Sequence, residues 1–420
     1  MKPLCILALG GLLTLPAQAE NGVDLTMTSR LIGEFHQIRP DSPFAAGLAR
    51  TGFGRDNGRF EEEVRGKLGS VSVLLTGSFS GQEGQNPKTR LVANEAFIDF
   101  GSGADRFTIG KKILSGDVGY AFRPIDVVQR EARMQLIPKA LEGIPNLMWE
   151  HYSGQQAWSL IIANPDRNRG PEPNKDGSLT LRYFNRIGVT DLHGVARYSS
   201  RYRLEAGAAF SSVPESSLEI HGSFLVQQRG ERTVPIRLPA NANPILLLAR
   251  SADDPNIMIS ESLKNPAKAL LGATWTTDNG WSVLAETWWD GTAPKPADWQ
   301  NLVRQTQIRN AMLGMPGIPA EGVNGALALS TRMFQNPSST RRGNLLRVSW
   351  TDPAGSGWST ALDVLQRPQG GGWIATLSAA WVADKLRIEG GYRRYGGSAN
   401  SVYRLLPEHQ VIFAGISLAF

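Results

Sequence analysis

Residues 409–420 read His-Gln-Val-Ile-Phe-Ala-Gly-Ile-Ser-Leu-Ala-Phe and end the chain. Ile412, Ala414, Ile416, Leu418 and Phe420 occupy every second position of this stretch. Successive side chains of a β-strand point to opposite faces of the sheet, so a period of two predicts a strand with one continuous apolar face.

The same period recurs along the chain. In residues 203–213, for example, Leu204, Ala206 and Phe210 share one face, and Arg203 and Glu205 share the other. Such alternation predicts strands that separate an apolar from a polar environment. Eighteen are expected: 24–37, 59–68, 70–82, 91–100, 105–113, 146–152, 157–164, 178–187, 192–199, 202–213, 217–228, 268–277, 281–289, 343–351, 358–367, 372–382, 385–395 and 409–420.

The connections between these expected strands sort by length. Every even-numbered connection is short, as at Asp278-Asn279-Gly280, and most carry turn residues. The long connections, at 38–58, 114–145, 229–267, 290–342 and 396–408, are all odd-numbered. One end of the sheet should therefore carry tight turns and the other long loops, as in an up-and-down barrel; a β-sandwich has no reason to sort its loops this way.

The tryptophans also gather at one end of the expected sheet. Seven of the eleven tryptophans lie near an expected short turn and on the apolar phase of their strands: Trp149, Trp158, Trp275, Trp281, Trp350, Trp358 and Trp381. Ordinary core tryptophans would scatter along the strands, whereas membrane barrels carry aromatic girdles where lipid meets water.

The first residues resemble an export signal. Lys2 precedes an apolar run from Leu4 to Leu15, and Pro16 precedes Ala17-Gln18-Ala19, an A-x-A cleavage pattern. We expect residues 1–19 to be a cleavable signal peptide and 20–420 to form one barrel domain. The apolar run is too short for a membrane anchor. Cys5 lies at the very start of this run and not after it, where a lipidated cysteine would lie, which disfavours a lipoprotein.

An alternating strand that closes on a terminal Phe, in an exported chain, resembles the C-terminal strand of Gram-negative outer-membrane porins. The resemblance implies an all-β, transmembrane, antiparallel up-and-down barrel of about eighteen strands (16–20), with short periplasmic turns and long extracellular loops, located in the outer membrane. It implies that Phe420, Leu418 and Ile416 form an assembly signal for the barrel assembly machinery, that outer-membrane lipid surrounds the barrel, and that a homotrimer is one candidate state. Eighteen strands is also the size associated with substrate-selective channels, although no motif identifies a subfamily.

Composition excludes several other classes of protein. Cys5 is the only cysteine, so the expected mature chain has neither disulfides nor a thiol nucleophile. Lys and Arg total 44 against 38 Asp and Glu, without a basic run, so we expect no nucleic-acid partner. No metal-binding or phosphate-binding motif occurs, and we expect no cofactor and no metal. The five histidines lie far apart and match no catalytic motif of membrane-barrel enzymes, so we expect no enzymatic activity.

Alternation also predicts which charged residues face the lumen. The two signs nearly balance there, with Arg347, Arg387, Arg393, Glu286, Asp363 and Glu389 among them. As candidates for lining the pore or binding solute we single out these strand residues: Arg65, Lys67, Arg106, Lys112, Arg182, Arg186, Arg197 and Arg203. The last four of these residues lie on three consecutive expected strands. Two interpretations of them are open: a basic ladder that guides an anionic solute, or a wall of ion pairs.

Loop 114–145 is the third connection on the side that carries the long loops. The resemblance implies that this loop folds into the lumen and narrows it, as the third loop does in classical porins. Tyr120, Arg123, Asp126 and Arg130 are its candidate solute contacts, and Asp126 to Lys139, which lacks glycine, is a candidate short helix. An ordinary surface loop of the same composition is the alternative. Within 290–342, Trp299 to Met315 predicts an amphipathic helix.

The leading functional hypothesis is a channel for diffusion or facilitated transport of small polar solutes, with anionic solutes as the narrower option. A polymer-export or secretion barrel, and a closed structural or adhesin barrel, are the alternatives.

Overall fold

The computed structural model describes residues 23–50, 54–131, 136–137, 140–164, 176–237, 257–336, 338–399 and 401–420. The expected signal peptide, with Ala17 and Ala19, lies outside the described residues. Its cleavage therefore stays a prediction.

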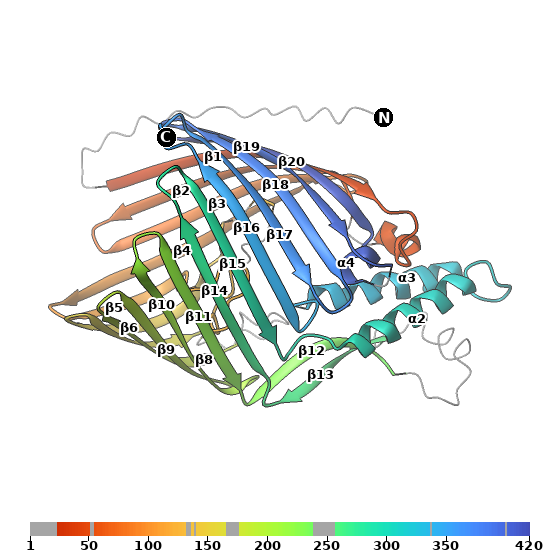
Figure 1. Ribbon diagram of the computed structural model, residues 1–420, viewed down its shortest axis with the longest axis horizontal. Coiled ribbons are helices and arrows are strands. Elements are labelled where there is room, and N and C mark those ends of the chain that lie inside the picture. The colour runs from red at the N-terminus through yellow and green to blue at the C-terminus, as the bar shows by residue number, and fades with distance from the viewer. Residues whose placement is uncertain are drawn as a thin grey trace.

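Eighteen strands form one sheet in which each strand pairs antiparallel with its neighbours along the chain, and the first pairs with the last. The result is the closed antiparallel barrel that the alternation predicted (Figure 1). Its strands are β1 (Val23–Ile38), β2 (Asn57–Leu68), β3 (Val71–Gln82), β4 (Lys88–Ser102), β5 (Asp105–Lys112), β6 (Ile144–Ser153), β7 (Gln156–Ala163), β8 (Ser178–Ile187), β9 (Thr190–Ser199), β10 (Arg203–Glu215), β11 (Leu218–Gln227), β14 (Ala267–Thr276), β15 (Trp281–Asp290), β16 (Arg342–Thr351), β17 (Trp358–Arg367), β18 (Gly372–Val382), β19 (Leu386–Gly396) and β20 (Glu408–Ala419).

The terminal strand closes the barrel. β20 lies between β19 and β1, with Ile416 opposite Leu31 of β1. The backbone N–H of Phe420 donates to the carbonyl of Met27 at 2.9 Å, and Phe420 accepts from Met27 in return at 3.2 Å. Ile416, Leu418 and Phe420 all project outward and are exposed, so the predicted apolar face is confirmed.

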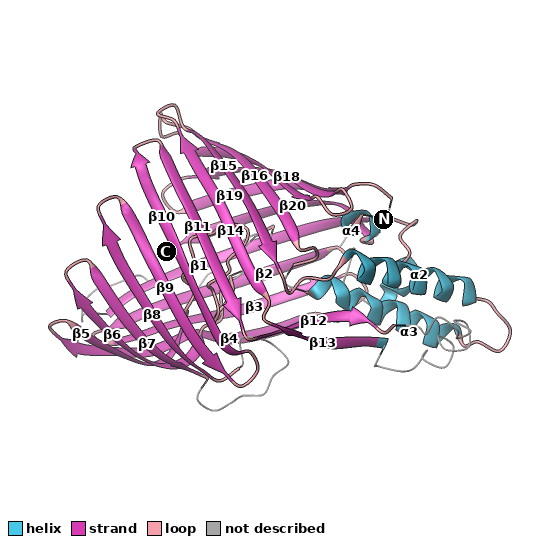
Figure 2. Ribbon diagram, turned by 60° about the horizontal axis from the view of Figure 1, so that its bottom comes forward, coloured by secondary structure: helices cyan, strands magenta, loops and turns pink. Residues whose placement is uncertain are grey.

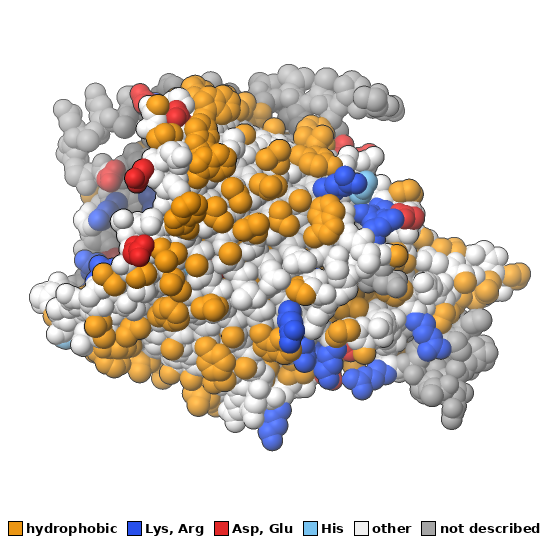
Figure 3. Space-filling model, in the orientation of Figure 1, with side chains coloured by type: hydrophobic (Ala, Val, Ile, Leu, Met, Phe, Trp, Pro, Cys, Tyr) orange, Lys and Arg blue, Asp and Glu red, His pale blue; other side chains and the backbone are white. Residues whose placement is uncertain are grey.

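Alternation places apolar side chains on the outer wall and polar ones inside. On β17, Trp358 and Leu362 are exposed outside, whereas Asp363 and Arg367 are buried inside. Apolar side chains cover much of the wall seen in Figure 3, and charged side chains gather mainly toward its margins. This outer surface suits hydrocarbon, and the inner surface suits water and polar solutes.

The sorting of connections by length is confirmed. Consecutive strands meet in short turns at one end of the barrel, for example at Gly69, whose φ of +56° suits the tight turn between β2 and β3. The long connections all leave the other end. The predicted tryptophan rim lies at the short-turn end, where Trp281 pairs with Trp350 and Trp358 with Trp381 on neighbouring strands.

The long connections build a cap at the opposite end (Figure 2). It contains the hairpin of β12 (Arg229–Pro235) and β13 (Met258–Lys264), the helices α2 (Pro296–Met312), α3 (Ala320–Ser330) and α4 (Val402–Leu405), and the 3₁₀ turns η1 (Ala45–Arg50) and η4 (Thr331–Gln335). The helix expected within 299–315 is confirmed as α2, which starts with Pro296 at its first position and Asp298 accepting from the N–H of Lys295 at 2.7 Å. None of the helices in the described part of the chain is long and apolar enough to cross a membrane.

An apolar core joins the cap to the barrel. Trp299 and Leu302 of α2 and Tyr403 of α4 are buried in one cluster with Trp288 of β15 and Leu345 of β16. The loops on this side therefore pack against the inner wall and hold fixed positions over the lumen.

Candidate functional site

The described residues of the connection between β5 and β6, namely 113–131, 136–137 and 140–143, fold into the barrel. Its Val128 packs in a cluster with Met148 and Ile161 on the wall, and Ile125 packs with Val195 and Leu225 farther round. Ile137 reaches the opposite wall, where it contacts the cluster of β1 and β20. The loop therefore crosses the bore, as the resemblance to classical porins implied.

Side-chain carboxylates brace this loop from within. Asp126 accepts hydrogen bonds from the Oγ of Ser115 at 3.0 Å, the N–H of Gly116 at 2.7 Å and the Nε of Arg123 at 2.5 Å. Residues 126–131 are not helical, whereas residues 132–135 and 138–139 of the candidate helix lie outside the described residues. The side chain of Gln129 instead joins distant parts of the loop, because it accepts from the N–H of Leu114 and donates to the carbonyl of Glu142, both at 2.8 Å.

A second carboxylate, Asp117, lies beside Asp126. It accepts from the backbone N–H groups of Val118 at 2.7 Å and Ile125 at 2.6 Å. Burial, and next the negative charge of Asp126, raise the pKa of Asp117 to about 6 despite these hydrogen bonds. The loop thus contains a carboxyl group whose pKa lies well above the ordinary range of aspartate.

One wall residue anchors the tip of the loop. Glu286 of β15, which is almost fully buried, accepts from the backbone N–H groups of Tyr120 at 2.5 Å and Ala121 at 2.8 Å. Its Oε1 also lies 3.0 Å from the Nε2 of His221 on β11. Phe122 stacks on Trp288, two residues along β15, with ring centroids 5.8 Å apart. The tip is therefore fixed by both polar and aromatic contacts.

The tip reaches the wall beyond β15 through Tyr120. The Nη1 of Arg347 on β16 donates to the Tyr120 hydroxyl at 3.0 Å and to the two carboxylate oxygens of Asp363 on β17 at 2.9 and 2.8 Å. The guanidinium also lies 5.4 Å from the centre of the Tyr120 ring. Arg347 is only partly buried, so this group remains accessible from the lumen.

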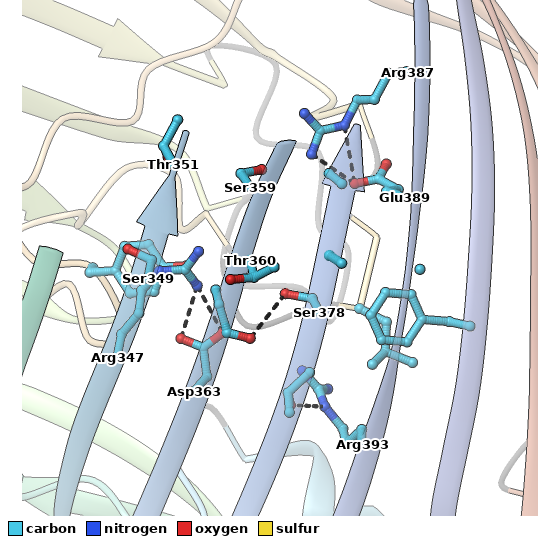
Figure 4. A pocket seen from close by; sticks show the side chains of 18 residues that line it. Arg347, Ser349, Thr351, Ser359, Thr360, Asp363, Ser378, Arg387, Glu389 and Arg393 are labelled. Atoms are coloured by element: carbon cyan, nitrogen blue, oxygen red, sulfur yellow. Dashed lines mark hydrogen bonds and ion pairs between the residues drawn. The ribbon is translucent and has the colours of Figure 1, made fainter. Parts of the chain in front are cut away.

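A cavity of about 300 Å³ opens between the loop and the wall of β16–β20. Arg347, Asp363 and Arg393 lie around this space from three different strands (Figure 4). Arg387 and Glu389 pair at 2.9 Å along its border, and hydroxyl groups supply much of the remaining lining: Ser349, Thr351, Ser359, Thr360, Thr376 and Ser378. The cavity is polar, contains three arginines against two acids, and has the size of a small solute.

A second cavity of about 280 Å³ lies toward the short-turn end, along β1–β4. Two predicted residues, Arg65 and Lys67, line it together with Asp24 and Glu95. The structure therefore places this predicted pair on the lumen side, away from the first cavity.

The four arginines proposed as a ladder are mostly engaged. Arg186 binds Asp191 through two hydrogen bonds of 2.6 and 2.8 Å, and Arg197, 2% exposed, pairs with Glu205. Arg182 donates to the carbonyl of Leu114 in the loop at 2.6 Å.

Arg203 differs from the lumen-facing position predicted for it. It starts β10 with a φ of +61° and donates to the hydroxyl of Tyr198, on the outer phase of β9, at 3.3 Å. The geometry favours the ion-paired wall over the ladder.

Of the other residues predicted to contact solute, some are held in ion pairs and some remain exposed. Arg123 is buried and held by Asp126 and Glu131, so it stabilises the loop and does not present a free cation to the lumen. Lys112 lies 3.6 Å from Asp99, and Arg106 is exposed near the short-turn end of β5. Arg130 is partly exposed and lies within electrostatic range of Lys268 on β14.

Alternation assigned the residues of the main cavity to the lumen but did not single them out. Arg347, Asp363 and Glu286 lie on adjacent strands, and only the strand register and the path of the loop bring them together. Their spacing in the sequence carries no signal of this meeting.

A closed barrel of eighteen antiparallel strands, with short turns and a tryptophan rim at one end and a loop folded into the bore, is the architecture of a porin-like outer-membrane protein. No family model matches the sequence, and neither does any curated protein. Solved structures do match. OccAB1 of Acinetobacter baumannii is 10% identical over 96% of this chain and 98% of its own, with a TM-score of 0.54. OccD3 (OpdP) of Pseudomonas aeruginosa is 11% identical over 95% of this chain and 91% of its own, with a TM-score of 0.52. At these identities the likeness concerns the fold.

Proposed function

We propose that this protein is an outer-membrane channel that lets small polar solutes cross by diffusion or facilitated transport, with a preference for anions. The observation that carries the proposal is the polar cavity between the inward-folded loop and β16–β20, whose arginines remain partly accessible. A wall in which every charge was paired and buried would suit a closed scaffold instead.

The charges of the cavity support the anion preference. Arg347, Arg387 and Arg393 face Asp363 and Glu389, which leaves one net positive charge. Charges that line a confined, low-dielectric passage act on ions more strongly than the same charges in bulk water. The surrounding hydroxyl groups can donate to an anion without adding charge.

We infer roles for the predicted lumen residues from their positions. Arg65 and Lys67 would act at the short-turn, periplasmic end, and Tyr120 would hold Arg347 in place at the narrow part. Arg130 would meet solutes near Lys268. Arg182, Arg186 and Arg197 would mainly stabilise the wall and the loop.

The test is planar-bilayer recording of the purified protein across a salt gradient. We expect a reversal potential that shows anion preference, which Arg393→Gln reduces. The matched control is Arg394→Gln, which removes the same charge from the adjacent residue on the outer phase of β19 and should leave the potential unchanged. Absence of conductance in the folded wild-type protein would refute the channel and favour the closed barrel. Conductance with cation preference would refute only the anionic part.

A further inference from the structure

One arginine of the cap is buried without a carboxylate. Arg309 lies on α2, and its side chain contacts α3, which runs beside α2 in the cap (Figure 2). At 1% exposure it is the most buried arginine of the described residues. Its Nη1 donates to the hydroxyl of Ser330 on α3 at 3.3 Å, whereas Nε and Nη2, both shielded from solvent, have no acceptor in the described part of the chain. Such a buried cation is costly unless another group compensates its charge.

The other buried arginines of the described residues have fuller sets of partners. Three of them pair with two carboxylates each: Arg123, Arg197 and Arg232. Arg39 donates to two backbone carbonyls, and Arg367 donates to a tyrosine hydroxyl and lies over a tryptophan ring. Arg309 has a single neutral acceptor. Burial lowers the pKa of its guanidinium to about 10, which still leaves the group charged at neutral pH.

The edge of a guanidinium formed by Nε and Nη2 binds carboxylates elsewhere in this protein. Arg186 holds Asp191 with these two nitrogens at 2.6 and 2.8 Å. Arg387 holds Glu389 with the same two nitrogens at 3.2 and 2.9 Å. In both pairs two N–H groups of the planar fork meet one carboxylate. Since Arg309 has the same edge, its chemistry selects a planar oxyanion.

Neighbouring amides of α2 do not serve this edge. Gln305, one turn before Arg309, donates through Nε2 to the carbonyl of Ile236 at 2.6 Å, and its Oε1 has no hydrogen-bond partner. Asn310, the next residue along α2, donates to the carbonyl of Pro43 at 2.6 Å. These contacts join α2 to two other segments of the cap. The described residues thus supply no acceptor for Nε and Nη2 of Arg309.

We propose that the cap binds a small planar oxyanion, of the carboxylate or hydrogen carbonate type, at Arg309 between α2 and α3. The ligand accepts from Nε and Nη2 as Asp191 accepts from Arg186, and its charge compensates the buried cation. The ion must be small because the guanidinium is buried. A ligand that binds only the packed helices stabilises them against opening. Arg309 does not line the main cavity, so the inference does not rest on what the channel conducts.

Amide exchange of the full-length protein in detergent, followed by mass spectrometry, tests this site. Sodium formate replaces sodium chloride at constant ionic strength and pH. Where exchange requires α2 and α3 to part, we expect it to slow by about a hundredfold once formate reaches about a hundred times its dissociation constant. Exchange in β17 should not change. A second series with hydrogen carbonate identifies which of the two ions the site prefers.

Variants of α2 show whether Arg309 carries the effect. Arg309→Met removes the guanidinium and keeps an apolar chain of similar length, so formate should no longer slow exchange. Arg309→Lys keeps the charge without the two-nitrogen edge and should weaken formate binding by about tenfold or more. The matched control is Arg304→Met, which removes an exposed arginine from the same helix and should keep the full effect.

The wild-type protein alone can decide against the site, even if a variant does not assemble its cap. Wild-type exchange in α2 and α3 that is equal in formate, hydrogen carbonate and chloride would overturn the proposal. A formate effect of the same size in a folded Arg309→Met protein would overturn it as well.

Discussion

The anchor of the loop tip at Glu286 leads to a quantitative prediction. Glu286→Ala removes the acceptor of the N–H groups of Tyr120 and Ala121, both inside the barrel. A hydrogen bond to a charged acceptor contributes about 1.5–3 kcal/mol, so the anchor loses about 3–6 kcal/mol. At about 1.4 kcal/mol per tenfold, even the lower value raises the detached fraction of the tip by more than about a hundredfold.

The assay is single-channel recording. If the tip narrows the bore, Glu286→Ala should raise the mean conductance and add flicker between levels, because Phe122 stacking on Trp288 still attracts the tip. Glu286→Gln keeps one acceptor oxygen and should lie between wild type and alanine.

The control is Glu389→Gln, a lumen carboxylate that pairs with Arg387 and holds no loop amide. Folding of each variant is checked by heat-modifiable gel migration. Conductance of Glu286→Ala equal to that of a correctly folded wild type would refute the assignment of the tip as the constriction.

Three further outcomes follow from the structure. The pKa of Asp117 is raised to about 6 from an ordinary 3.8, so the folded loop keeps a proton that the unfolded loop releases. The contribution of this proton to stability is complete below about pH 4 and is lost as pH rises through about 6. Amide exchange of Val118 and Ile125, corrected for intrinsic rates, should therefore become faster over that range, and protection that rises with pH would contradict this. Leu302→Ala should destabilise the packing of α2 by about 2–5 kcal/mol, because Leu302 is buried in the core that joins the cap to the barrel. Trypsin should then cleave within α2 faster than in the wild type, and an unchanged cleavage rate would contradict the shared core. Deleting Phe420 removes its two hydrogen bonds to β1 and the expected assembly signal, so less protein should reach the membrane as a folded barrel, and a normal yield would exclude that role.

The barrel was predictable from the sequence because its pattern is local. Alternation such as Ile412-Ala414-Ile416 needs only neighbouring residues, and the lengths of the turns then determine which strands pair. The rim tryptophans and α2 were predictable for the same reason. The hairpin of β12 and β13 was not, because its two strands lie in one long connection and alternate only weakly.

The site was predictable only in part. Alternation places Arg347 and Asp363 inside, but their contact with Tyr120 depends on the path of a loop that begins more than two hundred residues earlier. The ion pair of Arg197 with Glu205 likewise follows from the register of β9 with β10, which periodicity alone leaves open.

The pairing of β20 with β1 has a consequence for every protein that binds this barrel. Since the ladder closes on itself, all eighteen strands have a neighbour on each side, and the barrel lacks the two edge strands that an open sheet offers to an incoming strand. The closed sheet therefore disfavours recruitment by strand addition along the barrel wall, whereas the hairpin of β12 and β13 in the cap lies outside this sheet. Recognition on the wall then depends mainly on side chains, where single substitutions can create or abolish it.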